Sequence, residues 1–203
     1  MYPRPGLGLL LVGIAAGCLS GCQSGGPREV VFSRPEPSSF VLGKTSYRQI
    51  LEQYGQPTRR APWTKNGISL ETLSYGHGPA GQYQRPHVPD DANPERWLSF
   101  AFLDGRLVEY LFYSSFEDDH TDFDETKIPE IQKGQTTFPQ VISLLGKPAG
   151  FSIFPFVRAK DEHGITYNYV HTRKGRFYHK RLTVSFNARN VATDYDFLSE
   201  GDR

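Results

Sequence analysis

The sequence predicts an α+β fold of two tandem units, each a short helix or helical hairpin packed on a small antiparallel sheet. A signal peptide and a flexible tether are expected to precede them. Three observations predict this organisation. A fifteen-residue segment occurs twice, 91 residues apart, with a helical spacing of apolar residues in both copies. Stretches that alternate apolar and polar residues follow each copy, as expected for strands. A short apolar run opens the chain and ends at a cysteine.

The N-terminus has the organisation of a lipoprotein signal peptide. Arg4 supplies a positive charge, and an apolar run of 13 residues follows over positions 7–19. That run has the length of a secretory h-region and is shorter than the roughly 20 residues of a membrane-spanning helix. The sequence LSGC at 19–22 resembles the bacterial lipobox, in which the cysteine is lipidated and the preceding residues are removed. We therefore expect a signal peptide over residues 1–21 and lipid attachment at Cys22; a secretory signal cut near this cysteine, without lipid, is the alternative.

The composition of the mature chain narrows the classes of function. Only one charge, Arg4, lies in the signal peptide, so 22 basic residues face 22 acidic ones. A neutral balance predicts no nucleic-acid partner, because such proteins normally carry a strongly basic face. Cys18 leaves with the signal and Cys22 carries lipid, so no thiol remains for a disulfide, a metal or a nucleophile. Stability must come from burial, for which 14 Phe, 11 Tyr and 2 Trp provide ample material.

Four segments follow from composition and spacing. Residues 22–38 are rich in Gly, Ser and Pro, which predicts a lipidated flexible tether; Val30-Val31-Phe32 inside it is expected to dock as an edge strand. The first unit is assigned to residues 39–126 and the second to residues 127–203. A mobile loop is expected over residues 76–96 because Gly, Pro, Gln and Asp dominate there.

The repeated segment spans residues 43–57 and 134–148, and five of its fifteen positions are identical. Hydroxyl residues suited to capping open each helix, and a glycine followed by a proline closes it. The apolar residues recur at i, i+3, i+4 and i+7, which predicts one buried face for a short helix. These residues are Tyr47, Ile50, Leu51 and Tyr54 in the first copy, and Phe138, Val141, Ile142 and Leu145 in the second.

Six strands are expected after the two helices. The Asp104-Gly105 dipeptide between two apolar runs is a strong signal for a two-residue hairpin turn. A second hairpin is expected around residues 172–176, which read as a turn. The expected strands cover residues 69–75, 97–103, 106–113, 164–171, 180–186 and 190–197.

A family resemblance rests mainly on the second copy. Its motif is Ile131-x-x-Gly134-x-Thr136, then Val141, then Leu145-Gly146-x-Pro148, followed by Tyr167-x-Tyr169 and Leu182-Thr183-Val184-Ser185-Phe186. This pattern is similar to the SmpA/OmlA family of small outer-membrane lipoproteins, which includes the E subunit of the β-barrel assembly machine (BamE-like). The first copy matches more weakly. The tandem arrangement also resembles the secreted β-lactamase inhibitor proteins, which pair two helix-plus-sheet repeats into one concave surface.

The resemblance implies a lipid anchor in the outer membrane, a position facing the periplasm, and no catalysis or cofactor. The function it implies is a non-catalytic interaction or scaffold module in cell-envelope or outer-membrane protein assembly, with an envelope protein as partner. The alternative is a proteinaceous inhibitor of a periplasmic hydrolase. The assembly-machine subunit has one unit whereas this chain has two, so the identity of the partner stays open. The motif residues are caps, turns and core positions, which transfer architecture better than activity.

Few residues are candidates for chemistry. The six histidines form no dense ligand motif, so no metal site is predicted. The acidic run over residues 117–125 lacks the glycine of a calcium-binding EF-hand loop, which favours a solvated connection between the units. One basic cluster is a candidate for contact with lipid headgroups or an acidic partner, and the interpretation that the sequence favours is a soluble hairpin whose charges protect a sheet edge. Its members are Arg173, Lys174, Arg176, Lys180 and Arg181.

Overall fold

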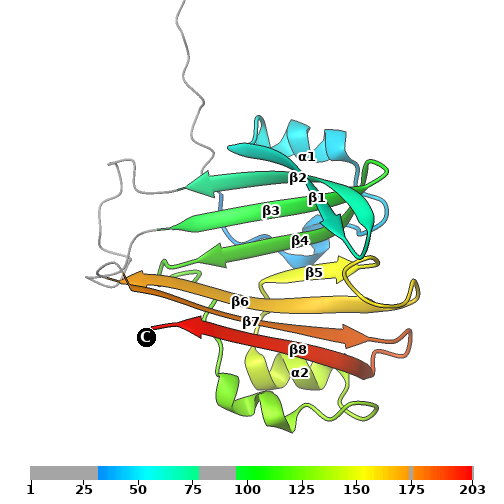
Figure 1. The fold of residues 1–203 in the computed structure, drawn as a ribbon, viewed down its shortest axis with the longest axis vertical. Coiled ribbons are helices and arrows are strands. Elements are labelled where there is room, and N and C mark those ends of the chain that lie inside the picture. The colour runs from blue at the N-terminus through cyan, green and yellow to red at the C-terminus, as the bar shows by residue number, and fades with distance from the viewer. Residues whose placement is uncertain (1–31, 78–94, 174–175, 203) are drawn as a thin grey trace, which may run out of the picture.

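One antiparallel sheet runs through both halves of the chain in the computed structural model, which describes residues 32–77, 95–173 and 176–202. The eight strands of these residues lie in the sheet in the order in which they occur in the sequence (Figure 1). Their bounds are β1 (Arg59–Lys65), β2 (Ile68–His77), β3 (Arg96–Leu103), β4 (Arg106–Ser114), β5 (Gly150–Ile153), β6 (His163–Arg173), β7 (Arg176–Phe186) and β8 (Ala192–Gly201).

The predicted fold of two units, each with a small sheet of its own, is wrong. β4 pairs with β5, with Tyr110 opposite Phe151 and Leu111 opposite Gly150, so the first four strands continue into the last four. The helical segments are few and short. They are η1 (Pro37–Ser39), α1 (Tyr47–Tyr54), η2 (Glu125–Glu130) and α2 (Phe138–Leu145). The predicted boundary between the units, after residue 126, falls inside η2.

The two predicted helices are confirmed, and their ends have the expected caps. Ser46 precedes α1, and its N–H donates to Gln49 Oε1 (2.8 Å) while the Gln49 N–H donates to Ser46 Oγ (3.2 Å). Thr137 precedes α2, and its N–H donates to Gln140 Oε1 (2.7 Å). Such reciprocal bonds satisfy amides that have no partner inside the helix. A glycine with positive φ ends each helix, Gly55 after α1 and its counterpart after α2.

A tyrosine from a neighbouring strand also fixes the end of each helix. The Tyr75 hydroxyl donates to the Gly55 carbonyl (3.0 Å), and the Tyr167 hydroxyl donates to the Gly146 carbonyl (2.9 Å). Both rings are buried, so each hydroxyl needs this partner. The same contact therefore recurs in the two halves of the chain, at nearly the spacing of the repeated segment.

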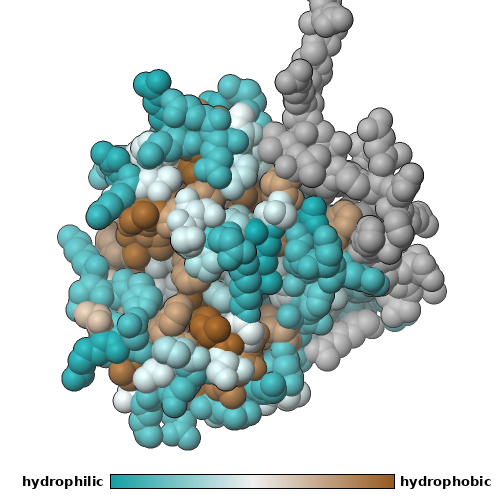
Figure 2. Space-filling model, turned by 180° about the vertical axis from the view of Figure 1, so that it is seen from behind, coloured by the Kyte–Doolittle hydropathy of each residue, from teal (hydrophilic) through white to brown (hydrophobic). Residues whose placement is uncertain are grey.

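Both helices pack on the same face of the sheet, α1 near one end and α2 near the other (Figure 1). Ile50 of α1 packs among buried residues of β2, β3 and β4. Val141 and Leu145 of α2 pack among buried residues of β6 and β7. Phe151 of β5 contacts both clusters, so the two cores meet at the junction of the halves. Figure 2 shows the molecule from behind, where hydrophilic side chains break up the hydrophobic patches.

The segment before α1 is held against both halves. Phe32 is buried and its ring lies against Phe112 of β4 (centroids 6.4 Å apart), although it forms no strand. The Arg34 guanidinium donates to the Lys147 carbonyl (2.6 Å), and Glu36 pairs with the Lys147 ammonium (2.9 Å). Residues 32–36 of the predicted tether are thus packed, and the rest of it up to residue 31 lies outside the described residues.

The expected loop 76–96 is shorter in the structure than in the prediction. Gly76 and His77 belong to β2, and Arg96 begins β3. Residues 78–94 lie outside the described part of the chain.

Candidate functional site

The sheet surface opposite α1 and α2, here called the open face, carries small and polar side chains. One row of directly paired residues crosses six strands of it, from β3 to β8. Its members are Ala101, Glu109, Ser152, Gly164, Ser185 and Asp194. Strand side chains alternate between faces, and the two larger apolar clusters lie on the helix side. A smaller apolar cluster, built on Leu70, Ala101 and Val108, lies on the open face, and no helix of the described residues covers that face.

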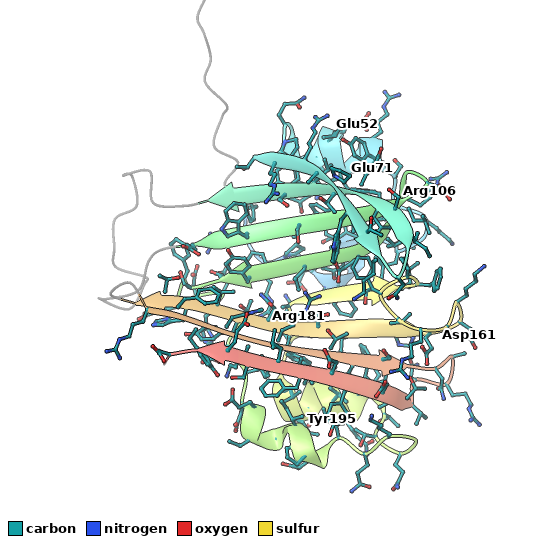
Figure 3. All side chains as sticks on the ribbon, viewed as in Figure 1. Glu52, Glu71, Arg106, Asp161, Arg181 and Tyr195 are labelled. Carbon is teal, nitrogen blue, oxygen red and sulfur yellow. The ribbon has the colours of Figure 1, made fainter. Side chains whose placement is uncertain are left out.

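A cavity of about 510 Å³ lies on the open face where the two halves of the sheet meet. We call it the junction pocket. Its floor comes from Glu109 of β4, Ser152 of β5, and Thr183 and Ser185 of β7. Arg181 of β7 also lines it and lies over the middle of the sheet in Figure 3. The remaining lining residues are Trp63, Lys65, Phe156, Val157, Arg158, Asp194, Tyr195, Asp196 and Leu198.

The β1–β2 hairpin forms one wall of the junction pocket by reaching the connection between β5 and β6. The Trp63 ring lies against the Phe156 ring, with centroids 5.2 Å apart. At the tip of the hairpin, the Asn66 side-chain amide donates to the Pro155 carbonyl (3.0 Å). Asn66 and Gly67 have φ of 52° and 76°, as a tight hairpin turn requires. These contacts fix Trp63 in place although its side chain is 40% exposed.

A charged pair lies at the floor of the junction pocket. Glu109 is only 7% exposed, and its Oε1 is 3.4 Å from Nη2 of Arg181. Burial raises the pKa of Glu109 to about 7, and the positive charges of Arg181 and Lys65 oppose that rise. The Arg181 side chain is about one-third exposed and lines the open pocket, whereas its partner is covered.

Ser152 adds a polar atom that the described residues leave unpaired. The residue is 1% exposed, and its Oγ has no hydrogen-bond partner among them. A Cβ on Gly164 would lie 2.8 Å from this Oγ, so only glycine leaves room for the hydroxyl. A buried hydroxyl without a partner is unfavourable, and in native proteins most such groups are satisfied by a ligand, water or side chain.

The structure separates the residues of the predicted basic cluster. Lys174 lies outside the described residues, as does the predicted lipid site Cys22. Arg173 is the last residue of β6 and lies opposite Arg176, the first residue of β7, in the strand register. The Arg176 side chain is exposed. Lys180 and Arg181 are neighbours in sequence, but alternation along β7 sends them to opposite faces of the sheet.

Lys180 has a structural role on the helix side. It is 5% exposed, and its Nζ lies 2.7 Å from the Asp122 carboxylate and 4.6 Å from the centre of the Phe123 ring. Phe123 is itself buried, and Asp119 pairs with Arg96 (2.9 Å). Thr121 and Phe123 anchor the acidic segment on the sheet, while Glu117, Asp118, Asp122 and Asp124 are exposed as expected for a solvated connection. Lys180 is buried under this segment and is unavailable to a headgroup.

Within residues 32–77, 95–173 and 176–202, no group of three or more His, Cys, Asp or Glu side chains is placed to hold a metal ion. No helix in the same ranges has the length and apolar character needed to span a bilayer.

Comparison with known proteins does not identify a family for this chain. No family model matches the chain, and no curated protein matches it. Among solved structures the chain matches a "putative beta-lactamase inhibitor protein" from Streptococcus mutans, with 13% sequence identity and a TM-score of 0.38. The match covers 76% of this chain and 82% of that one. A likeness this distant carries no argument about function, and the SmpA/OmlA resemblance stays an expectation from sequence.

Proposed function

We propose that the protein is a bacterial lipoprotein, anchored through Cys22 to the outer membrane and facing the periplasm, which binds a protein partner on the open face. It acts as a non-catalytic interaction or scaffold module in cell-envelope or outer-membrane protein assembly. The observation that carries the proposal is the uncovered sheet surface with the junction pocket at its centre.

The open face has features that protein partners use. Small side chains on its floor let a partner's backbone approach closely. Trp63 is exposed yet held by Phe156, and rigid aromatic side chains of this kind frequently dominate binding energy. Charges of both signs, such as Arg181 and Asp196, line the same pocket and can specify the orientation of the partner.

The inhibitor hypothesis uses the same surface. A pocket bounded by β1 on one side and β8 on the other can receive a protruding segment of an enzyme. This alternative expects a one-to-one complex with a soluble hydrolase and inhibition on mixing, whereas the scaffold proposal expects recovery of membrane proteins.

A charged side chain placed in the junction pocket is expected to abolish partner binding. Ser185→Arg fills the floor, and at least a tenfold loss of recovered partner is expected because a well-packed core of the interface would be blocked. The measurement is affinity capture of the lipidated protein from native membranes, with partners identified by mass spectrometry. Ser143→Arg, at an exposed position of α2, is the matched control.

The outcomes separate the hypotheses. Equal recovery of partners by the two arginine variants contradicts binding on the open face. Recovery of soluble enzymes alone would replace the scaffold proposal with the inhibitor.

Replacing the lipidated cysteine is expected to release the protein from the membrane. Cys22→Ser removes the acyl chains, each CH₂ of which contributes about 0.8 kcal/mol to anchoring when buried in the bilayer. Fractionation of the envelope should move the variant from the membrane to the soluble periplasmic fraction. Cys18→Ser, inside the signal peptide, should leave the protein in the membrane, and unchanged membrane residence of Cys22→Ser would refute the anchor.

A further inference from the structure

The junction pocket is lined by equal numbers of basic and acidic side chains. Its basic side chains are Lys65, Arg158 and Arg181, and its acidic ones are Glu109, Asp194 and Asp196. Within the pocket Arg158 pairs with Asp194 (3.1 Å) and Arg181 with Glu109 (3.4 Å). The pocket thus mixes both signs, two of its basic side chains already have an acidic partner, and the chemistry of the lining favours a neutral ligand over a simple ion.

The paired charges still present many hydrogen-bonding positions. A guanidinium has five N–H donors and a carboxylate accepts about four hydrogen bonds, so one ion pair leaves most of these positions open. The Ser152 hydroxyl adds a donor and acceptor that no described residue satisfies. A ligand that both donates and accepts at closely spaced positions fits this floor best. Hydroxyl groups have that property.

One wall of the pocket is aromatic. Trp63 is 40% exposed at the rim, and its contact with Phe156 holds the indole at the edge of the polar floor. A ligand must therefore combine an apolar flat side with polar edges. A sugar ring does so, because its C–H groups form a face that packs on an indole while its hydroxyls point outward.

We propose that the junction pocket binds a short neutral saccharide, with one ring against Trp63 and its hydroxyls bonded to Glu109, Arg181 and Ser152. A volume of about 510 Å³ lies within the range of small-molecule sites. This site goes beyond protein binding, and it does not require that the protein partner be found. The same chemistry is offered by the N-acetylated amino sugars of cell-wall glycan and by neutral hexose polymers.

The test is calorimetric titration of the full lipidated protein, held in a detergent without a sugar headgroup. The N-acetylglucosamine trimer and maltotriose are the two probes, one for each source of saccharide. We expect saturable binding of at least one. Trp63→Ala should weaken it by about tenfold, as expected for loss of an aromatic contact. Ser152→Ala should weaken it by about fivefold, as expected for loss of one hydrogen bond.

The control is Phe177→Ala, which removes another exposed aromatic residue from a position outside the pocket. It should bind as the parent does. The proposal is overturned if neither probe gives saturable heat, if Trp63→Ala binds like the parent, or if Phe177→Ala weakens binding as much as Trp63→Ala.

A second measurement does not depend on those variants. The chain has two tryptophans, so Trp97→Phe leaves Trp63 as the sole indole. Its fluorescence should shift and saturate on titration with the bound probe. An unchanged spectrum at saturating probe contradicts contact with Trp63. Failure of the saccharide titrations leaves the result of the affinity capture unaffected, so the two proposals fail separately.

Discussion

Gly150→Ala is expected to destabilise the protein by about 3 kcal/mol or more, near the upper end of the range for steric overpacking. An added Cβ would lie 2.2 Å from the Tyr110 carbonyl oxygen and 3.0 Å from the Leu111 Cα, both in the backbone of β4. Backbone atoms of a paired strand cannot move aside as the end of a flexible side chain can. The clash therefore acts on the β4–β5 ladder, which joins the first four described strands to the last four.

Urea unfolding of the non-lipidated Cys22→Ser chain would measure this loss. Ser152→Ala lies on the same strand, two residues away, and removes a hydroxyl that has no partner among the described residues. It should be neutral or slightly stabilising, because a buried unpaired polar group is lost. Equal midpoints for Gly150→Ala and its parent would contradict the pairing of β4 with β5 seen in the structure.

The local elements of the fold could be predicted from sequence. Apolar spacing and caps placed α1 and α2 at their observed residues because each helix closes its hydrogen bonds within a few positions. The Asp104-Gly105 turn could be predicted for the same reason, and both residues have the positive φ that the turn needs (49° and 71°).

The continuity of the sheet could not be predicted. β5 has four residues, Gly150–Ile153, and so little alternation that periodicity does not reveal it. β1 was missed because Pro62 and Trp63 interrupt any alternating pattern within it. The pairing of β4 with β5 also joins strands separated by about 40 residues, and nothing local specifies such a register.

The candidate site shows the same limit. The sequence held one signal of the candidate site, which is Glu109 in the middle of the apolar strand Arg106–Ser114. A carboxyl in such an apolar run is unusual, because acidic side chains are rarely buried without a partner. Trp63, Ser152 and Arg181 come from three other strands and meet only through tertiary structure. The sequence suggested a single basic patch because its charges are close together along the chain. The structure divides the patch, because a strand places Lys180 and Arg181 on opposite faces of the sheet.

Glu109→Gln is expected to stabilise the protein at alkaline pH by up to about 3 kcal/mol, the free energy that corresponds to a carboxyl pKa raised from 4.5 to about 7. Burial disfavours the charged form, so the folded state keeps the proton of Glu109 over a range where the unfolded chain has lost it. Stability from this group is therefore full below the unfolded pKa, falls as pH rises from about 4.5 to about 7, and is constant above. Glutamine does not titrate, so the Glu109→Gln variant does not lose this stability as the pH rises.

The groups that face this carboxyl set the size of the effect. Arg181 of β7 and Lys65 of β1 favour its ionised form and already oppose the rise in pKa. Replacing Glu109 leaves Arg181 without this partner, but the Arg181 side chain is about one-third exposed, so water can solvate its charge. At pH 8 the Glu109→Gln variant should therefore be more stable to unfolding than its parent. At pH 4 the two proteins should unfold at the same urea concentration.

Urea unfolding at pH 4, 6 and 8 separates the cost of burying the Glu109 carboxylate from the stabilisation that Arg181 and Lys65 give to it. Glu71→Gln, at an exposed position of β2, is the matched control and should leave the difference between pH 4 and pH 8 as it is in the parent. A smaller difference for Glu109→Gln alone assigns the pH dependence to burial of one carboxyl in the junction pocket. Parallel curves for parent and variant would mean that Arg181 compensates that burial fully, and the floor of the pocket would then be a stable ion pair at neutral pH.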